Sequence, residues 1–206
     1  MQLLVAGIVE YYGELPRTEL TAVVLAVAYL VLAIRQNIWC WFCAAISTAM
    51  YVVLFARANL YMESLLNVFY FGMAIYGWSV WRSGETDDEL AVSVWPIHVH
   101  VYAISIIICV AAVTGFLLAK FTHAAYPYID SATTYAAIWA TFLVARKILE
   151  NWWYWLAIDA VSVFIYWTRG LEATAVLFVV YVVLIPIGLV AWTRSYRQHH
   201  VVAVPG

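Results

Sequence analysis

The sequence ENWWYWLAIDAVS, residues 150–162, sets three tryptophans and a tyrosine side by side and then places an aspartate inside an apolar run. Positions 152, 155 and 159 share one face of an α-helix, so Trp152, Trp155 and Asp159 are expected to form a single stripe. Flat indole rings beside a carboxylate suit a flat or cationic ring compound, because the rings stack and attract cations while the carboxylate balances charge. The stretch therefore predicts a helix that contributes to a small-molecule site.

The amino-acid composition indicates that most of the chain lies in lipid. Of its 206 residues, 67% are hydrophobic and 11% are charged, whereas a soluble domain carries about 25% charged residues. The formal charge of −2 and the lack of a basic run argue against a nucleic-acid partner. We predict an all-α integral membrane protein with seven transmembrane helices. The predicted spans are 20–34, 38–56, 61–81, 97–120, 129–147, 150–168 and 171–193.

The placement of positive charge orients these spans. Seven spans put the termini on opposite sides, and the side of the C-terminus carries six Lys and Arg residues against four on the other. Lys and Arg are enriched on the cytoplasmic side of membrane proteins, so we expect a cytoplasmic C-terminus. The first 17 residues include Glu10, Glu14 and Arg17 and lack the pattern of a secretory signal peptide.

The chain contains an internal repeat. Moving the sequence against itself by 111 positions aligns the first three spans with the last three and leaves 97–120 unmatched. The matched pairs include Pro16 and Pro127, Arg35 and Arg146, Trp41 and Trp152, Tyr70 and Tyr181, Gly77 and Gly188, and Trp81 and Trp192. A single linker span returns the second half in the same orientation, which predicts parallel repeats in a three-plus-one-plus-three arrangement. Such repeats, with a site at the midplane between them, are typical of transporters.

The repeat and the charge pattern divide the chain into predicted segments. They are an N-terminal segment (1–17), a first three-helix repeat (18–82), an acidic loop (83–96), a linker helix (97–120), a second three-helix repeat (127–193) and a C-terminal tail (194–206).

Polar residues inside the spans are the candidates for the site. A carboxylate at mid-membrane costs about 2.5–3.5 kcal/mol on insertion scales, so we expect Asp159 to face an interior cavity; the alternative is a structural pin to a buried Lys or Arg. In the repeat, Asp159 aligns with Thr48 and Trp152 with Trp41, so both halves would present a tryptophan and a polar group. Thr48 could instead serve helix packing alone.

A second candidate pair lies in the third span. Asn67 stands in the middle of that span, and Tyr70 follows one turn later. We expect both to contribute to the site, with a helix–helix hydrogen bond as the alternative role for Asn67. Aromatic residues at span ends, namely Trp78, Trp81, Trp192 and Tyr196, are expected to anchor the membrane interface.

Motifs of soluble enzymes are missing from the sequence. It contains no G-x-x-x-x-G-K-[ST], H-E-x-x-H or G-x-S-x-G pattern, so we expect neither an enzyme nor a cofactor. Cys40 and Cys43 form C-W-F-C inside an apolar span with no second pair, and we interpret them as small packing residues. His98 and His100 at the start of the linker span have no expected metal partner, so no metal site is predicted.

Two helices resemble those of the PnuC family of vitamin transporters. They are LYMESLLNVFYFGMAIYGWSVWR (60–82) and ARKILENWWYWLAIDAVSVFIYWTRG (145–170), and the resemblance covers roughly residues 20–195. The family motif N-W-x-x-W-x-x-x-N reads Asn151, Trp152, Trp155 and Asp159 here.

The second family motif is L-L-Q-x-F-x-F-x-x-N-x-Y-G-W. In this chain the Gln position is Asn67 and the Asn position is Ala74, whereas Tyr76, Gly77 and Trp78 are kept. Together with Asp159 in place of the final Asn of the first motif, three polar contacts of the family differ.

The resemblance implies a three-plus-one-plus-three fold, similar to that of SWEET sugar transporters, in a bacterial inner membrane. It implies facilitated diffusion of an unphosphorylated B-vitamin, nicotinamide riboside first, with phosphorylation by a cytosolic kinase trapping the product. Thiamine is the alternative within the family, and a sugar facilitator or a sensor the alternative outside it. Expected partners are the vitamin and membrane lipid, and related half-size folds pack as homotrimers. The implied substrate-binding residues are Trp152, Trp155, Asp159, Asn67, Trp41, Thr48, Tyr70 and Asn151.

Overall fold

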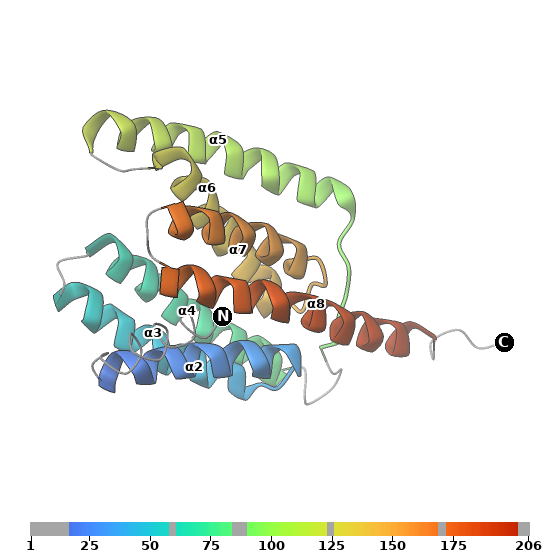
Figure 1. Ribbon diagram of the computed structural model, residues 1–206. Helices are drawn as coiled ribbons and strands as arrows, with labels where there is room; N and C mark the ends of the chain where they lie inside the picture. Colours follow the sequence, from blue (N-terminus) through green and yellow to red (C-terminus); the bar gives the residue numbers. More distant parts are fainter. Residues whose placement is uncertain (1–16, 58–60, 84–89, 123–125, 169–171, 202–206) are drawn as a thin grey trace. The chain divides into compact units, whose positions relative to one another are not determined.

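The computed structural model describes residues 17–57, 61–83, 90–122, 126–168 and 172–201, and within these ranges it is helical throughout apart from short connections (Figure 1). The described part contains seven helices and no β-strand beyond one isolated bridge, between Ser93 and Ile148. The predicted all-α fold is therefore confirmed. The helices are α2 (Arg17–Ile34), α3 (Trp39–Arg57), α4 (Tyr61–Ser83), α5 (Ile97–Phe121), α6 (Pro127–Ala145), α7 (Asn151–Thr168) and α8 (Glu172–Val201).

The last helix is longer than the span predicted for it. The apolar run ends near residue 193, where Arg194 and Arg197 begin a polar stretch, yet α8 continues to Val201. Arg, Gln and Tyr all tolerate helical geometry, so the loss of hydropathy ends the apolar span without ending the helix.

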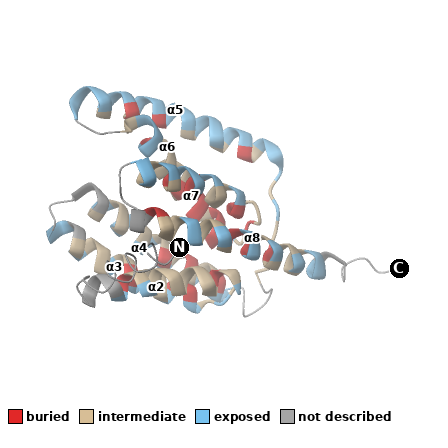
Figure 2. Ribbon diagram, viewed as in Figure 1, coloured by how far each residue is buried: buried red, intermediate tan, exposed pale blue. Residues whose placement is uncertain are grey.

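The outer surface of the helices is apolar. Two segments, Ile97–Phe121 and Ala175–His199, are long and apolar enough to cross a membrane, with mean hydropathies of 2.5 and 2.7, and α2 and α3 contain shorter apolar stretches. Figure 2 shows that most of α5 is exposed, and the exposed side chains include Ile97, Tyr102 and Ile106. Large apolar side chains in such number would not face water on a monomeric soluble protein, so lipid is the solvent that this surface fits.

The chain forms two compact units. The first contains residues 1–90 and 190–195, and the second contains residues 91–189 and 196–206. In the first unit α3 packs against both α2 and α4, and in the second α6 packs against both α5 and α7.

Matched turns end the first helix of each repeat. Gln36 and Lys147, which are 111 residues apart, both have positive φ, at 54° and 51°. The N–H of Gln36 donates to the carbonyl three residues earlier at 3.0 Å, and that of Asn37 donates to the carbonyl five residues earlier at 2.9 Å. Lys147 and Ile148 repeat the pattern at 3.0 and 2.9 Å. Both turns are Schellman motifs, which satisfy carbonyls that a helix end would otherwise leave unpaired. The local backbone thus repeats with the same offset as the sequence.

The residue with positive φ in each turn is a position where substitution by glycine should stabilise the protein. A left-handed conformation costs an ordinary residue about 1–2 kcal/mol, which glycine avoids at a smaller cost in chain entropy. We expect Gln36→Gly to stabilise the protein by roughly 0.5–1 kcal/mol, seen as a higher melting temperature in detergent. Arg146→Gly is the control because Arg146 has a φ of −92°, and it should lower the melting temperature. Equal losses in both variants would contradict the assignment of strain to the turn.

Candidate functional site

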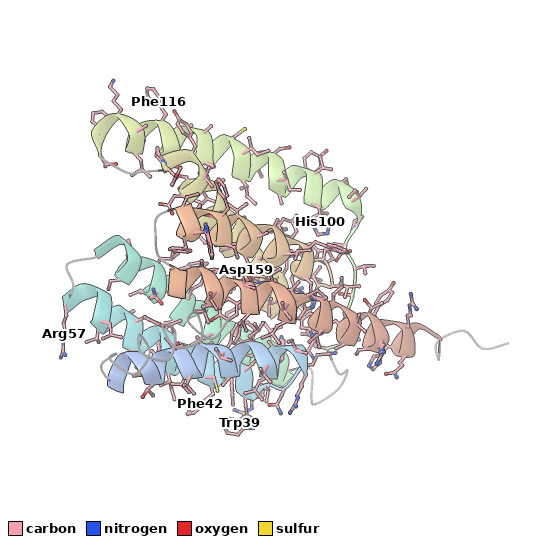
Figure 3. All side chains as sticks on the ribbon, viewed as in Figure 1. Trp39, Phe42, Arg57, His100, Phe116 and Asp159 are labelled. Atoms are coloured by element: carbon pink, nitrogen blue, oxygen red, sulfur yellow. The ribbon has the colours of Figure 1, made fainter. Side chains whose placement is uncertain are left out.

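The α7 stripe lies on the buried face of its helix. Trp152 and Asp159 are 2% and 6% exposed, and Trp155 is half-buried, whereas Trp153 on the opposite face is 57% exposed. Figure 3 labels Asp159 on α7. The helical face predicted from the spacing is therefore the one that α7 turns inward.

The carboxylate of Asp159 has no bonding partner among the described residues of its own unit. Among the described residues of the second unit, none donates a hydrogen bond to its carboxylate or forms an ion pair with it. Burying an ionised carboxylate without such a partner is strongly unfavourable. No described Lys or Arg of this unit therefore supports the role of a structural pin.

The tryptophans of the stripe have different surroundings. The indole of Trp152 lies against Gly188 of α8, so closely that a Cβ on the glycine would overlap the ring. Trp155 packs beside a small cluster formed by Ala137, Ala140 and Ile158. Trp152 is therefore enclosed, whereas Trp155 keeps part of its surface open.

Asn151 holds the start of α7. It is fully buried, and its Nδ2 donates to the carbonyl of Ile148 at 2.6 Å. Its Oδ1 is buried with no hydrogen-bond partner in the described structure. The amide thus closes the α6–α7 turn and keeps one acceptor available.

The remaining predicted residues lie in the first unit, on α3 and α4. Trp41 is 2% exposed and lies against Gly77, with the rings of Tyr29 and Trp81 at centroid distances of 5.9 and 5.5 Å. It is as enclosed in its unit as Trp152 is in the other.

The polar candidates of the first unit are less enclosed. The hydroxyl of Thr48 donates to the carbonyl of Ala44 at 2.8 Å, within its own helix. That bond accommodates a hydroxyl in an apolar helix and favours the packing role for Thr48. Asn67 and Tyr70 are both half-buried on α4.

The eight predicted residues therefore form two groups. Four lie on α7 in the second unit, and four lie on α3 and α4 in the first.

Two of the four aromatic residues at span ends are not interfacial anchors. The prediction of anchors at Trp78, Trp81, Trp192 and Tyr196 is wrong for Trp81 and Trp192, because these two side chains are only 4% and 0% exposed. The indole N–H of Trp192 donates to the carbonyl of Ala33 at 3.0 Å, and the Trp81 and Trp192 rings lie 6.5 Å apart within the first unit. Tryptophan suits an interface and a core alike, because the same N–H can meet water or a carbonyl.

Sequence reasoning missed a polar cluster on the second unit. His100, labelled on α5 in Figure 3, is 6% exposed, with Nδ1 3.1 Å from the Tyr154 hydroxyl and Nε2 4.0 Å from a Glu150 carboxylate oxygen. The cluster lies at a groove of about 640 Å³ between α5, α6 and α7. His100 is 50 residues from Glu150 and 54 from Tyr154 in the chain, and no local spacing signals such a contact.

The cysteines of the C-W-F-C pattern form no disulfide within the described residues. Cys40 is buried and Cys43 half-buried. In the ranges that the structure describes, no three His, Cys, Asp or Glu side chains form a group that could hold a metal ion.

Comparison with known proteins places the chain among membrane transporters. A family model described as "Nicotinamide mononucleotide transporter" matches residues 17–194. The nicotinamide riboside transporter PnuC of Escherichia coli (strain K12) is 24% identical over 193 residues, covering 81% of each chain. The riboflavin/roseoflavin transporter RibM of Streptomyces davaonensis is 25% identical over 183 residues, covering 85% of this chain and 84% of RibM. The crystal structure of the vitamin B3 transporter PnuC has the same fold, with a TM-score of 0.70 and 18% identity over 96% of this chain and 90% of that one.

The buried indole of Trp192 yields a prediction about stability. Trp192→Phe removes the hydrogen bond to Ala33 and part of the ring volume, so we expect a loss of about 1–3 kcal/mol. Thermal unfolding in detergent measures it. Trp153→Phe is the control, since Trp153 is 57% exposed and should leave the melting temperature nearly unchanged. Equal shifts in the two variants would show that Trp192 is an interfacial residue after all.

Proposed function

The chain belongs to the nicotinamide mononucleotide transporter family, as the resemblance of its two motif helices predicts, and on that premise we propose that it carries an unphosphorylated B-vitamin, nicotinamide riboside first, by facilitated diffusion. The protein is a transporter and not an enzyme. The membrane in question is the bacterial inner membrane, with the C-terminus on the cytoplasmic side.

One observation carries the choice of substrate. Asp159 is buried on the same face of α7 as Trp152 and Trp155, and no described residue of its unit balances its charge. Nicotinamide riboside has a flat pyridinium ring with a fixed positive charge. Such a ring can stack on indole and neutralise the carboxylate at once, which is the combination that a buried acid beside tryptophans requires.

The remaining residues of the predicted site also suit the vitamin. Trp41 and Tyr70 have aromatic rings, and Asn67 has an amide for its polar groups. Asn151 has a buried acceptor oxygen without a hydrogen-bond partner among the described residues. Transport would follow from rocking of the two repeats around this site. Phosphorylation by a cytosolic kinase would then trap the product, because the added charge prevents its return. A homotrimer is the assembly that related half-size folds suggest.

Thiamine is the second candidate. It also carries a fixed positive charge on a flat ring, so the argument from Asp159 applies to it equally. The positions held by Asn67, Ala74 and Asp159, which differ from the nicotinamide riboside motifs, are where a change of substrate would be encoded. Riboflavin, which RibM is named for, and sugars are neutral and give Asp159 no charge to balance.

Calorimetry on the purified protein separates these candidates. The ligands are nicotinamide riboside, thiamine, riboflavin, nicotinamide and the phosphorylated vitamins, and uptake into liposomes tests whether binding leads to flux. We expect nicotinamide riboside to bind and Asp159→Asn to weaken it at least about tenfold, because the carboxylate no longer balances the pyridinium.

Asp130→Asn is the matched control, because it neutralises an exposed carboxylate on α6 and should leave the affinity unchanged. Thiamine binding without nicotinamide riboside binding would reassign the substrate. Riboflavin binding that Asp159→Asn leaves intact would overturn the role of the carboxylate, and binding without uptake would indicate a sensor.

A further inference from the structure

Two glycines at matched positions of the repeat each lie against the face of a tryptophan. A Cβ on Gly77 would overlap the ring of Trp41, and a Cβ on Gly188 would overlap the ring of Trp152. In each case the built atom is nearly equidistant from three consecutive ring atoms. That geometry places the glycine over the face of the indole and not at its edge.

The two contacts agree in spacing as well as in shape. Trp41 and Gly77 are 36 residues apart in the first unit, and Trp152 and Gly188 are 36 residues apart in the second. Both glycines are buried. The other described helix glycines behave differently: Gly72 on α4 has nothing within 4 Å of an added Cβ, and Gly115 meets a tyrosine.

We propose that Gly77 and Gly188 are positioning residues for the substrate site. This inference rests on the proposed vitamin site, because it assigns the glycines a role in orienting that site's tryptophans. Each glycine leaves a hollow in which one indole face is seated. A side chain at either position would push the ring out.

The seating of Trp152 fixes more than one ring. Trp155 and Asp159 follow on the same face of α7, so an indole held at the start of the helix also fixes the rotation of the helix. That rotation decides where the carboxylate and the second indole lie. In the first unit, the rings of Tyr29 and Trp81 close around Trp41 in the same way, which gives α3 its own fixed rotation.

The test compares Gly188→Ala and Gly77→Ala with Gly72→Ala, the last being the control on α4 with open space around it. Calorimetry with nicotinamide riboside is run on the folded, monodisperse fraction of each protein. We expect Gly188→Ala and Gly77→Ala to lose affinity at least about tenfold and Gly72→Ala to match the parent protein. A purely structural role would lower the melting temperature and leave the affinity of the folded fraction unchanged, and that result would overturn the proposal.

A double-mutant cycle covers the case in which Gly188→Ala folds poorly. Trp152→Phe shrinks the ring, so adding it to Gly188→Ala should relieve the overlap. The double variant should then melt higher than Gly188→Ala alone and bind nicotinamide riboside at least about threefold more tightly. Additive losses in melting temperature and in affinity would refute the seating of the Trp152 ring on Gly188.

Failures of the two proposals are distinguishable. If the parent protein binds no vitamin, the proposed function fails, and non-additive melting temperatures then show only that Gly188 seats the ring of Trp152. If the parent protein binds nicotinamide riboside and Gly188→Ala has the same affinity and melting temperature, the positioning role of the glycine is wrong and the proposed function stands.

Discussion

Lipid around the helices leaves no water to solvate a buried polar group, and both units of this protein are built under that constraint. The Schellman turns at Gln36 and Lys147 satisfy helix-end carbonyls. Hydroxyls inside the helices donate back to their own backbone, as those of Thr48 and Thr141 do at 2.8 and 2.7 Å. The carboxylate of Asp159 and the Oδ1 of Asn151 are exceptions, because no described residue of their unit bonds to them. A buried carboxylate without a partner favours a ligand site at this position.

The two repeats share the same local structural features. The left-handed turn residues and the indole–glycine contacts all recur at an offset of 111 positions. The polar group is what differs: Thr48, bonded to its own helix, stands where the second repeat has Asp159. The scaffold is therefore shared between the repeats, and the charge belongs to one of them.

Periodicity and the repeat predicted the fold class and the buried face of α7, because both depend on spacing along one helix. The burial of Trp81 and Trp192 escaped prediction, since an aromatic residue at a span end has the same hydropathy in a core as at an interface. The cluster of His100, Glu150 and Tyr154 escaped it because its members meet only after folding. The eight site residues remain a prediction. The structure places each of them within its own unit.

If Asp159 selects a cationic ring, two ligands that differ only in the charge of that ring should bind with different affinities. Reduction of nicotinamide riboside adds a hydride to the ring and removes its positive charge while the ribose is kept. We would measure the affinities of the oxidised and reduced forms for the parent protein and for Asp159→Asn. We expect the parent protein to prefer the oxidised form at least about tenfold and the variant to lose this preference. Equal affinities in the parent protein, or a preference that persists in Asp159→Asn, would contradict it.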